Sequence, residues 1–178
     1  MGSKIIDVRC VQMRLEKKVA LITGAAAGLP DGLMGFGGAS AWRFVREGAK
    51  VVLTDINQAL GERSAQAIRD EGGDAIFFNL DVTSAVAWDG VIASTLSKYG
   101  RLDVMVNNAG TAAPANLENT TEDIWDQQMD VHAKGVFLGT KAAIAPMRDV
   151  GGGSIVNISS IYGIIGSPTS TAYHAAKG

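Results

Sequence analysis

The chain has 178 residues, which is enough for one domain with a substantial buried core. Its 16 basic and 18 acidic side chains give a net charge of -2, so we expect no nucleic-acid or anionic-membrane partner. The composition, with 22 Gly, 4 Pro and no glycine repeat, excludes collagen-like, disordered and disulfide-rich proteins. We therefore expect a single globular α/β domain over residues 1–178, with an N-terminal lead-in over residues 1–16.

The N-terminal lead-in bears on where the protein works. Cys10 is the single cysteine and cannot form an internal disulfide, which is typical of a reducing compartment. The first residues hold no apolar run long enough for a signal peptide, and no stretch approaches the roughly 18 apolar residues of a membrane span. These features predict a cytoplasmic protein without a membrane partner. We also expect no metal site.

Five short apolar runs alternate with longer segments of helical pattern along the chain. Most of these runs are nearly continuous rather than alternating, as is typical of parallel strands that are buried on both faces. The expected strands are 19–23, 50–54, 75–80, 102–107 and 154–159. Joined by right-handed helical crossovers, they predict a doubly wound parallel sheet.

The segments between these strands have helical patterns, and three of them begin at a capping residue. The expected helices cover residues 38–47, 57–72, 83–100 and 120–142. Asn57 and Thr83 are the expected caps of the second and third helices. Thr120 with Asp123 forms the expected capping box of the fourth.

A glycine-rich connection follows the first strand. Gly24 and Gly28 lie between that strand and a helix, where bare backbone, amide groups and the helix dipole favour a bound pyrophosphate. The alternative is an ordinary loop, because a glycine pattern alone is weak evidence. The strand before the connection and the helix after it favour the phosphate site.

Asp55 comes at the end of the second strand. A carboxylate at this place in a dinucleotide-binding sheet accepts hydrogen bonds from the adenosine ribose and repels a 2'-phosphate. The alternative role for Asp55 is a cap for the helix that begins near Asn57. Neither the glycine-rich connection nor the segment just after Asp55 contains Arg or Lys, so the expected cofactor is NAD rather than NADP.

The last residues of the chain include a candidate acid/base group. Tyr173 and Lys177 are four residues apart and share one helix face, and an ammonium group beside a phenol stabilises the phenolate. Ser160 follows a buried strand, where its hydroxyl can point at a substrate above the sheet. An isolated Tyr–Lys pair is usually an ordinary exposed pair, and Ser160 shifts the balance towards a catalytic site.

Taken together, these motifs resemble the short-chain dehydrogenase/reductase family over nearly the whole chain. The matching motifs are Thr23-Gly24-x-x-x-Gly28, Asp81-Val82, Asn107-Asn108-Ala109-Gly110, and Ser160, Tyr173 and Lys177 at spacings of 13 and 4 residues. Motifs in this order and at these separations are hard to produce by chance. The resemblance implies a Rossmann-like fold, without the last strands of the family, and an oxidoreductase that uses a nicotinamide cofactor.

The resemblance also implies a role for each motif. Tyr173 would exchange a proton with the substrate oxygen, Ser160 would hydrogen-bond that oxygen, and Lys177 would hold the nicotinamide ribose. The other implied cofactor contacts are Asp81 and Val82 at the adenine, and Asn108, Ala109 and Gly110 along the cofactor path. The expected reaction is hydride transfer between NAD and a small secondary alcohol or ketone.

The glycine-rich connection departs from the family pattern, in which Gly-x-Gly runs directly into the helix. Here Pro30 follows Gly28, and about seven extra residues precede the helix. Either residues 30–36 are inserted between two motif glycines, or Gly35-Phe36-Gly37 replaces residues 28–30 at the phosphate. Pro30 has no amide hydrogen to donate, so it is a poor substitute for a motif glycine.

Further departures concern the catalytic set and the end of the chain. His132 stands where the family usually has Asn, and it could hold a relay water, titrate near neutral pH, or simply make one backbone hydrogen bond. His174 is expected at the surface, off the face that carries Tyr173 and Lys177. Family members usually continue beyond this point with further strands and much of the dimer interface. Without them, we expect the strand 154–159 to be a bare sheet edge.

Three hypotheses for the function follow. The first is an NAD-dependent dehydrogenase or reductase of small secondary alcohols and ketones that is a homo-oligomer in its complete form. The second is a non-catalytic NAD-binding or dimerising truncated form, which the missing C-terminal part and the altered glycine connection favour. The third is a sugar-nucleotide epimerase or dehydratase, which the Asn-Asn-Ala-Gly motif supports less well.

Overall fold

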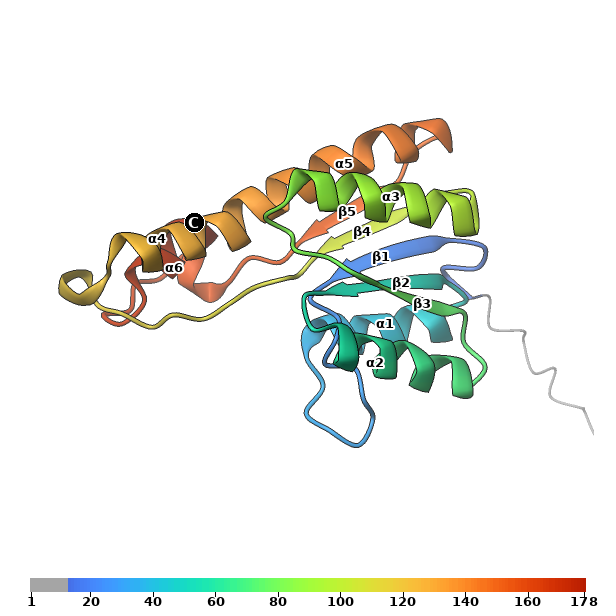
Figure 1. The fold of residues 1–178 in the computed structure, drawn as a ribbon, viewed down its shortest axis with the longest axis horizontal. Helices are drawn as coiled ribbons and strands as arrows, with labels where there is room; N and C mark the ends of the chain where they lie inside the picture. Colours follow the sequence, from blue (N-terminus) through green and yellow to red (C-terminus); the bar gives the residue numbers. More distant parts are fainter. Residues whose placement is uncertain (1–12) are drawn as a thin grey trace, which may run out of the picture.

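The computed structural model describes residues 13–178, so Cys10 and most of the lead-in lie outside the described residues. Five parallel strands form one sheet in the order β3-β2-β1-β4-β5 (Figure 1). Their bounds are β1 Val19–Thr23, β2 Lys50–Asp55, β3 Ala75–Asn79, β4 Val104–Asn107 and β5 Ser154–Asn157. The doubly wound parallel sheet is confirmed, although several strand ends differ by one or two residues from the expected ones.

Two helical layers cover the sheet, one on each face (Figure 1). Helices α1 (Phe36–Arg46) and α2 (Gln58–Asp70) pack on one face, and α3 (Ala85–Tyr99) and α5 (Gly135–Asp149) pack on the other. Successive strand residues point to opposite faces of the sheet. Ile22 therefore belongs to the core between the sheet and helices α1 and α2, whereas Leu21 belongs to the core between the sheet and helices α3 and α5. Both side chains are fully buried, which explains the continuous apolar run of β1.

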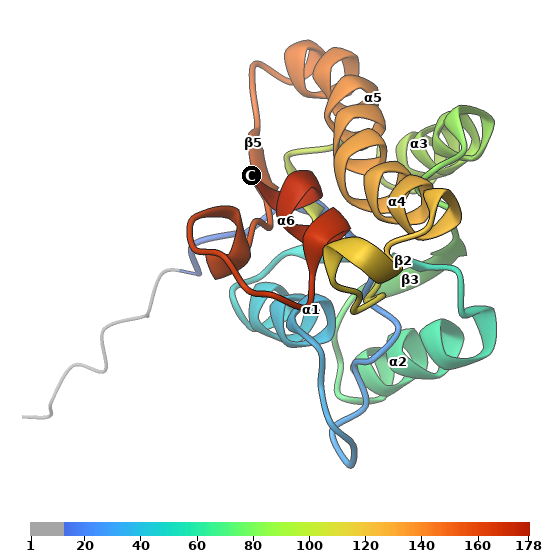
Figure 2. The same ribbon diagram turned by 90° about the vertical axis from the view of Figure 1, so that its left-hand side faces the viewer.

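The strand order creates a crevice at the carboxyl end of the sheet. From β1 the sheet grows first through β2 and β3, and then on the other side through β4 and β5. The connections that follow β1 and β4 therefore leave towards opposite faces, and ligands bind such sheets at this switch point. Figure 2 faces this end, where the last helix, α6 (Thr171–Lys177), packs beside α4 (Glu122–Gln128).

Side-chain hydrogen bonds set where the helices begin. Asn57 caps α2 as predicted, because its side chain accepts from the Leu60 amide at 3.1 Å. The prediction that Thr83 caps α3 is wrong by one residue, since Ser84 accepts the capping hydrogen bond. The hydroxyl of Thr83 donates instead to Asp81 at 2.8 Å, which ties Thr83 to the turn before the helix.

The long helix expected from Thr120 has three parts. It begins one residue later than predicted, because Thr121 rather than Thr120 accepts the capping hydrogen bond of α4. A π-helical segment, Met129–Lys134, then joins α4 to α5. The π segment has no signal in the apolar periodicity, and segments of this kind are frequent at functional sites. His132 lies within it.

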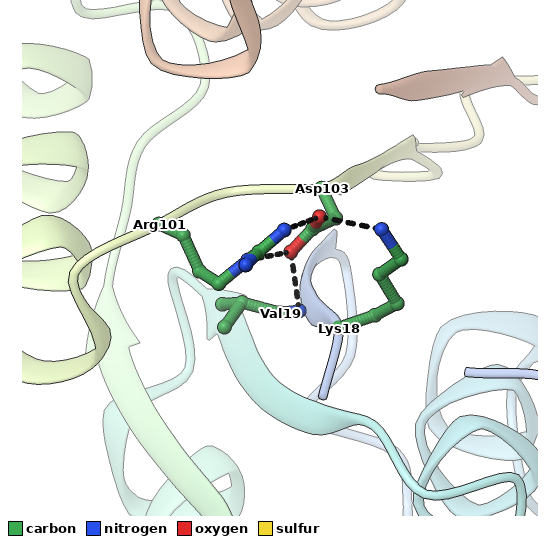
Figure 3. A network of polar contacts seen from close by, with 4 residues as sticks. All are labelled: Lys18, Val19, Arg101 and Asp103. Carbon is green, nitrogen blue, oxygen red and sulfur yellow. Dashed lines mark hydrogen bonds and ion pairs between the residues drawn. The ribbon is translucent and has the colours of Figure 1, made fainter. Parts of the chain in front are cut away.

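At the amino end of the sheet, a buried carboxylate joins two strands (Figure 3). Asp103 accepts hydrogen bonds from the Val19 amide at 2.9 Å, from Lys18 at 3.1 Å and from Arg101 at 2.6 and 2.7 Å. Burial acts to raise the pKa of Asp103, but the hydrogen bonds from Arg101, Val19 and Lys18 and the charge of Arg101 lower it to about 2. The ionised carboxylate therefore holds the start of β1 against the start of β4.

Strand β5 forms one edge of the sheet. Its Val156 side chain is 43% exposed, so part of the apolar surface of this strand meets solvent, as the sequence predicts for residues 154–159.

Within residues 13–178, no helix combines the length and the apolar character that crossing a membrane requires.

Candidate active site

One cavity of about 740 Å³ opens at the carboxyl end of the sheet. Its walls come from the connection after β4, from the π-helical segment, from the connection after β5 and from α6, with one side chain from the start of α1. The predicted site residues that line it are Asn108, Gly110, His132, Ser160, Tyr173 and Lys177. The fold therefore brings together residues from four separate parts of the chain.

Ser160, Tyr173 and Lys177 are among the polar residues that line this cavity. Ser160 accepts a hydrogen bond from the Tyr162 amide at 3.2 Å, which leaves its own hydroxyl proton for an oxygen in the cavity. Lys177 donates to the carbonyl of Ile158 at 2.6 Å, and its Nζ lies 5.8 Å from the centre of the Tyr173 ring. Burial lowers the pKa of Lys177. A phenol, a hydroxyl and a partly desolvated ammonium group thus face one space.

The short helix α6 is fixed to the preceding loop by hydrogen bonds at its last residue and at His174 in its middle. Ser159 donates to the carbonyl of Lys177 at 2.9 Å. The expectation that His174 lies at the surface is wrong, because the ring is half-buried and stacks 4.8 Å from Tyr162. Its Nδ1 lies 2.6 Å from the Tyr162 carbonyl, and its Nε2 accepts from the Ser167 amide at 2.9 Å. His174 therefore orients the helix that carries Tyr173.

The turn after β1 is shaped by close backbone contacts. Gly24 has a φ of +65°, a left-handed conformation that favours glycine, and a Cβ there would lie 2.8 Å from the Ala109 Cα. A Cβ on Gly37 would collide with the Gly24 carbonyl and lie 2.7 Å from the Asn108 side chain. Bare backbone therefore lines the space between β1, β4 and the start of α1, and a pyrophosphate needs such a surface.

The extra residues of this connection form a loop whose two ends lie close together. The Gly35 amide donates to the Ala27 carbonyl at 2.9 Å, and this hydrogen bond holds the two ends of the loop together. Both backbone groups of Gly28 are occupied: its amide donates to Ser64 at 3.2 Å, and its carbonyl accepts from the Trp42 indole at 2.6 Å. Of the two sequence alternatives, the geometry favours Gly35-Phe36-Gly37, because Gly28 faces the protein interior.

The start of α1 has the features of an anion site. Gly35 is its N-cap and no side chain caps the helix, so the amides of the first turn have no intrahelical acceptor. The first turn carries no acidic residue, and the helix dipole places a partial positive charge there. The arrangement fits a diphosphate held by Phe36 and Gly37 amides.

A second cavity, of about 340 Å³, adjoins the first beside β2 and β3. The predicted residues Gly24, Asp55, Asp81, Val82, Ala109 and Gly110 line it. The carboxylate of Asp55 accepts from the Ala26 amide at 3.1 Å and from the Asn57 amide at 3.0 Å. Asp55 therefore links the turn after β1 to the start of α2, while Asn57 is the cap of α2.

Thr23, the first residue of the glycine motif, also joins two strands at the site, a role that the motif alone does not predict. Its hydroxyl oxygen accepts from the amides of Asn108 and Ala109, each at 2.9 Å. The Asn108 side chain donates back to the Thr23 carbonyl at 2.8 Å. These bonds lock the ends of β1 and β4 together, and the only sequence signal for them is a hydroxyl residue at the end of a buried strand.

The family model for short chain dehydrogenases matches residues 18–178. A cyclopentanol dehydrogenase of Comamonas sp. is 42% identical over 165 residues, which cover 93% of this chain and 63% of that protein. An NADP-dependent (R)-specific alcohol dehydrogenase of Lentilactobacillus kefiri is 41% identical over 167 residues, with 93% and 63% covered. The chain therefore spans about 63% of the length of these curated relatives.

Two further comparisons agree. The 2,5-dichloro-2,5-cyclohexadiene-1,4-diol dehydrogenase of Sphingobium indicum is 42% identical over 164 residues, covering 92% of this chain and 63% of that protein. A crystal structure described as a short-chain dehydrogenase/reductase from Burkholderia xenovorans superposes with a TM-score of 0.85 at 35% identity, covering 92% of this chain and 65% of that one. The chain belongs to the short-chain dehydrogenase/reductase family of oxidoreductases.

Proposed function

We propose that this chain carries the cofactor and catalytic site of an NAD-dependent oxidoreductase that acts on a small secondary alcohol or the corresponding ketone. The observation that supports this most directly is the 740 Å³ cavity, where Ser160, Tyr173 and Lys177 face one another beside the glycine-lined end of β1 and β4. The dehydrogenase relatives support the reaction class.

The side chains divide the chemistry between them. Tyr173 takes the hydroxyl proton of an alcohol, or returns a proton to a ketone oxygen. Ser160 donates its hydroxyl proton to the same oxygen and so fixes the position of the reacting carbon. Lys177, held by the Ile158 carbonyl, supplies positive charge beside the phenol. Beside these residues, the carbinol carbon would lose its hydride to a nicotinamide cofactor held at this site, or receive it in the reverse direction.

The residues present fit a dinucleotide. The first turn of α1 would bind the diphosphate, Asp55 the adenosine ribose, and Asp81 with Val82 the adenine, while Asn108, Ala109 and Gly110 would line the path to Lys177. The described residues that line the 340 Å³ cavity include two carboxylates, Asp55 and Asp81, and no cation. Because a 2'-phosphate would meet negative charge there, we propose NAD as the cofactor.

The composition of the catalytic cavity supports an uncharged substrate. Its described lining residues include no carboxylate. Beside uncharged polar side chains such as Asn108, Thr111 and Ser170, they include small or apolar residues, namely Ala112, Ala113, Pro114, Ile158 and Ile161. Lys177 is the one cation among the described lining residues, and we assign it to the cofactor. The names of two relatives, which act on cyclopentanol and on a cyclohexadienediol, support small alicyclic alcohols.

The proposal is tested by following nicotinamide absorbance with the purified chain, cyclopentanol or cyclohexanol, and either NAD or NADP. We expect NADH formation with NAD and slower or no reaction with NADP. Binding of NAD without turnover of any alcohol or ketone would overturn the catalytic assignment and support the non-catalytic NAD-binding hypothesis. Turnover with NADP in preference to NAD would overturn the role of Asp55.

A further inference from the structure

His132 lies at the meeting point of three parts of the candidate active site. It belongs to the π-helical segment, is 4% exposed, and lines the catalytic cavity. Its Nε2 lies 2.9 Å from the Thr111 carbonyl oxygen and 3.3 Å from the Thr111 amide. The ring also meets Tyr173 edge to face, with 5.0 Å between ring centres. One side chain therefore touches both the connection after β4 and the helix that carries Tyr173.

The His132 ring packs tightly against the connection after β4. A Cβ placed on Gly110 would lie 2.7 Å from Cε1 and 3.3 Å from Nδ1 of His132, which means that the ring packs directly against Gly110. The residues that follow Gly110, from Thr111 to Pro114, form one wall of the catalytic cavity. The position of His132 therefore decides where that wall begins.

The contacts of Nε2 determine the protonation state of the ring. A ring nitrogen can donate to the Thr111 carbonyl or accept from the Thr111 amide, but not both, and the carbonyl contact is shorter. Protonated Nε2 leaves Nδ1 as a bare acceptor, and Nδ1 is buried without a hydrogen-bond partner among the described residues. A second proton would put a donor at this buried place with nothing to accept it.

The surrounding charges act in the same direction. Burial lowers the pKa of His132, the hydrogen bond to Thr111 acts to raise it, and the charge of Lys177 lowers it further. The titratable groups that α6 presents to the ring are Tyr173 and Lys177. Neither is a carboxylate that could stabilise an imidazolium ion.

We propose that His132 is a positioning residue which, as a neutral ring protonated on Nε2, holds the Gly110–Thr111 turn and the Tyr173 ring at their places in the cavity. It does not exchange protons during the reaction. The inference rests on the proposed function for its catalytic meaning. The tautomer, and the contacts of the ring with the Gly110–Thr111 turn and with Tyr173, which we call the His132 clamp, are properties of the chain itself.

The chain contains its own reference for testing the tautomer. It has two histidines, and the contacts of His174 require the opposite form, because its Nε2 accepts from the Ser167 amide and its Nδ1 faces the Tyr162 carbonyl. Nitrogen-15 NMR of the labelled chain, with each ring assigned through His132→Asn and His174→Asn, distinguishes these forms. At pH 7 we expect protonated Nε2 in His132 and protonated Nδ1 in His174. A charged His132, or one protonated on Nδ1 alone, would overturn the inference.

A pair of substitutions tests the clamp. The amide nitrogen of Gln at position 132 can reach the place of Nε2, whereas that of Asn is too short. We expect His132→Gln to keep the backbone NMR signals of residues 110–114 near their wild-type positions, and His132→Asn to shift them. Equal shifts in both variants would contradict the clamp. These spectra decide the inference even if the wild-type chain shows no turnover, in which case it is the proposed function that fails.

In a chain that turns over, the same variants separate positioning from proton exchange. We expect His132→Asn to raise the KM of the alcohol about tenfold, while the shape of the pH profile and kcat change little. We expect His132→Gln to restore most of the loss in KM. A fall in kcat together with the loss of a limb of the pH profile would show that His132 exchanges protons, and would overturn the inference.

Discussion

The two ends of the parallel sheet differ in whether their buried polar groups are hydrogen-bonded. At the amino end, Asp103 is 4% exposed and accepts hydrogen bonds from two cationic side chains and one backbone amide. At the carboxyl end, in α4 and in the π-helical segment that follows α4, buried polar atoms of Asn107, Gln128 and His132 have no partner among the described residues. The fully hydrogen-bonded Asp103 carboxylate joins strands, whereas the unpartnered ring nitrogen of His132 and the bare glycine backbone lie at the cavities where a ligand would be recognised.

This contrast shows how stability and function are divided in the fold. Hydrogen bonds at the amino end connect the starts of β1 and β4 and leave no polar atom of Asp103 for a ligand. At the carboxyl end, a side chain on Gly24 or Gly37 would fill the space between β1, β4 and α1. Substitutions at the two ends should therefore have separable effects, on stability at one end and on binding or turnover at the other.

The largest effect is expected from Tyr173→Phe. Loss of the phenol hydroxyl removes the acid/base group but keeps the ring against His132, so turnover should fall by about a hundredfold or more. The affinity for NAD, measured by calorimetry, should change little. Tyr99→Phe is the matched control, since Tyr99 pairs with Asp74 away from the cavity. Wild-type turnover in Tyr173→Phe would exclude the assignment of Tyr173.

A change in cofactor affinity is expected from Gly37→Ala. Its Cβ would meet the Gly24 carbonyl and the Asn108 side chain, so the start of α1 must move away from β1. We expect the Kd for NAD to rise about tenfold or more. Gly90→Ala is the control, because Gly90 lies in α3 with open space around it, and this change should stabilise the helix by about 0.5–1 kcal/mol. Unchanged NAD affinity in Gly37→Ala would remove this turn from the cofactor site.

At the amino end, Asp103→Asn should reduce the free energy of unfolding at pH 7 by about 2 kcal/mol. The pKa of Asp103 is about 2 in the folded chain and ordinary when unfolded, so its stabilisation is full above the unfolded pKa and disappears as the pH falls towards 2. Urea unfolding between pH 2 and 7 should show this slope in the wild type and a flatter one in Asp103→Asn. The exposed Asp89→Asn is the control. A variant as stable as the wild type at pH 7 would contradict the role of the Asp103 carboxylate in holding β1 against β4.

The smallest effect is expected from Gln128→Met. Gln128 is fully buried, and both polar atoms of its amide lack a partner among the described residues. Replacing the amide by a side chain of similar size removes its desolvation cost and should raise the free energy of unfolding by about 1 kcal/mol. Gln127→Met, at the exposed neighbouring position, should leave stability unchanged. Destabilisation by Gln128→Met would show that this amide has a role in the folded chain.

Much of the fold follows from the sequence because the signals are local. A strand buried on both faces needs apolar residues at nearly every position, so β1, with every residue buried, is recognisable from Val19–Thr23 alone. The cap at Asn57 is also local, and it is correct. Where two hydroxyl residues are adjacent, as at Thr83–Ser84 and Thr120–Thr121, the sequence does not distinguish them, because either one can cap a helix.

The parts that the sequence does not predict depend on contacts between distant segments. Whether Gly28 or Gly35-Phe36-Gly37 faces the cofactor depends on Ser64 and Trp42, which hold Gly28 in the interior. The burial of His174 depends on Tyr162 and Ser167 in the preceding loop. The edge contact of His132 with Tyr173 depends on the packing of α6 against the π-helical segment.

A calorimetric titration of the purified chain with NAD and with NADP tests the proposed cofactor site most directly. In this proposal the carboxyl end of the sheet forms an NAD site, with Gly35-Phe36-Gly37 at the diphosphate and Asp55 at the ribose. We predict binding of NAD with a Kd at least about tenfold lower than that of NADP. A chain that is folded by circular dichroism but binds neither nucleotide, or that prefers NADP, would contradict this claim.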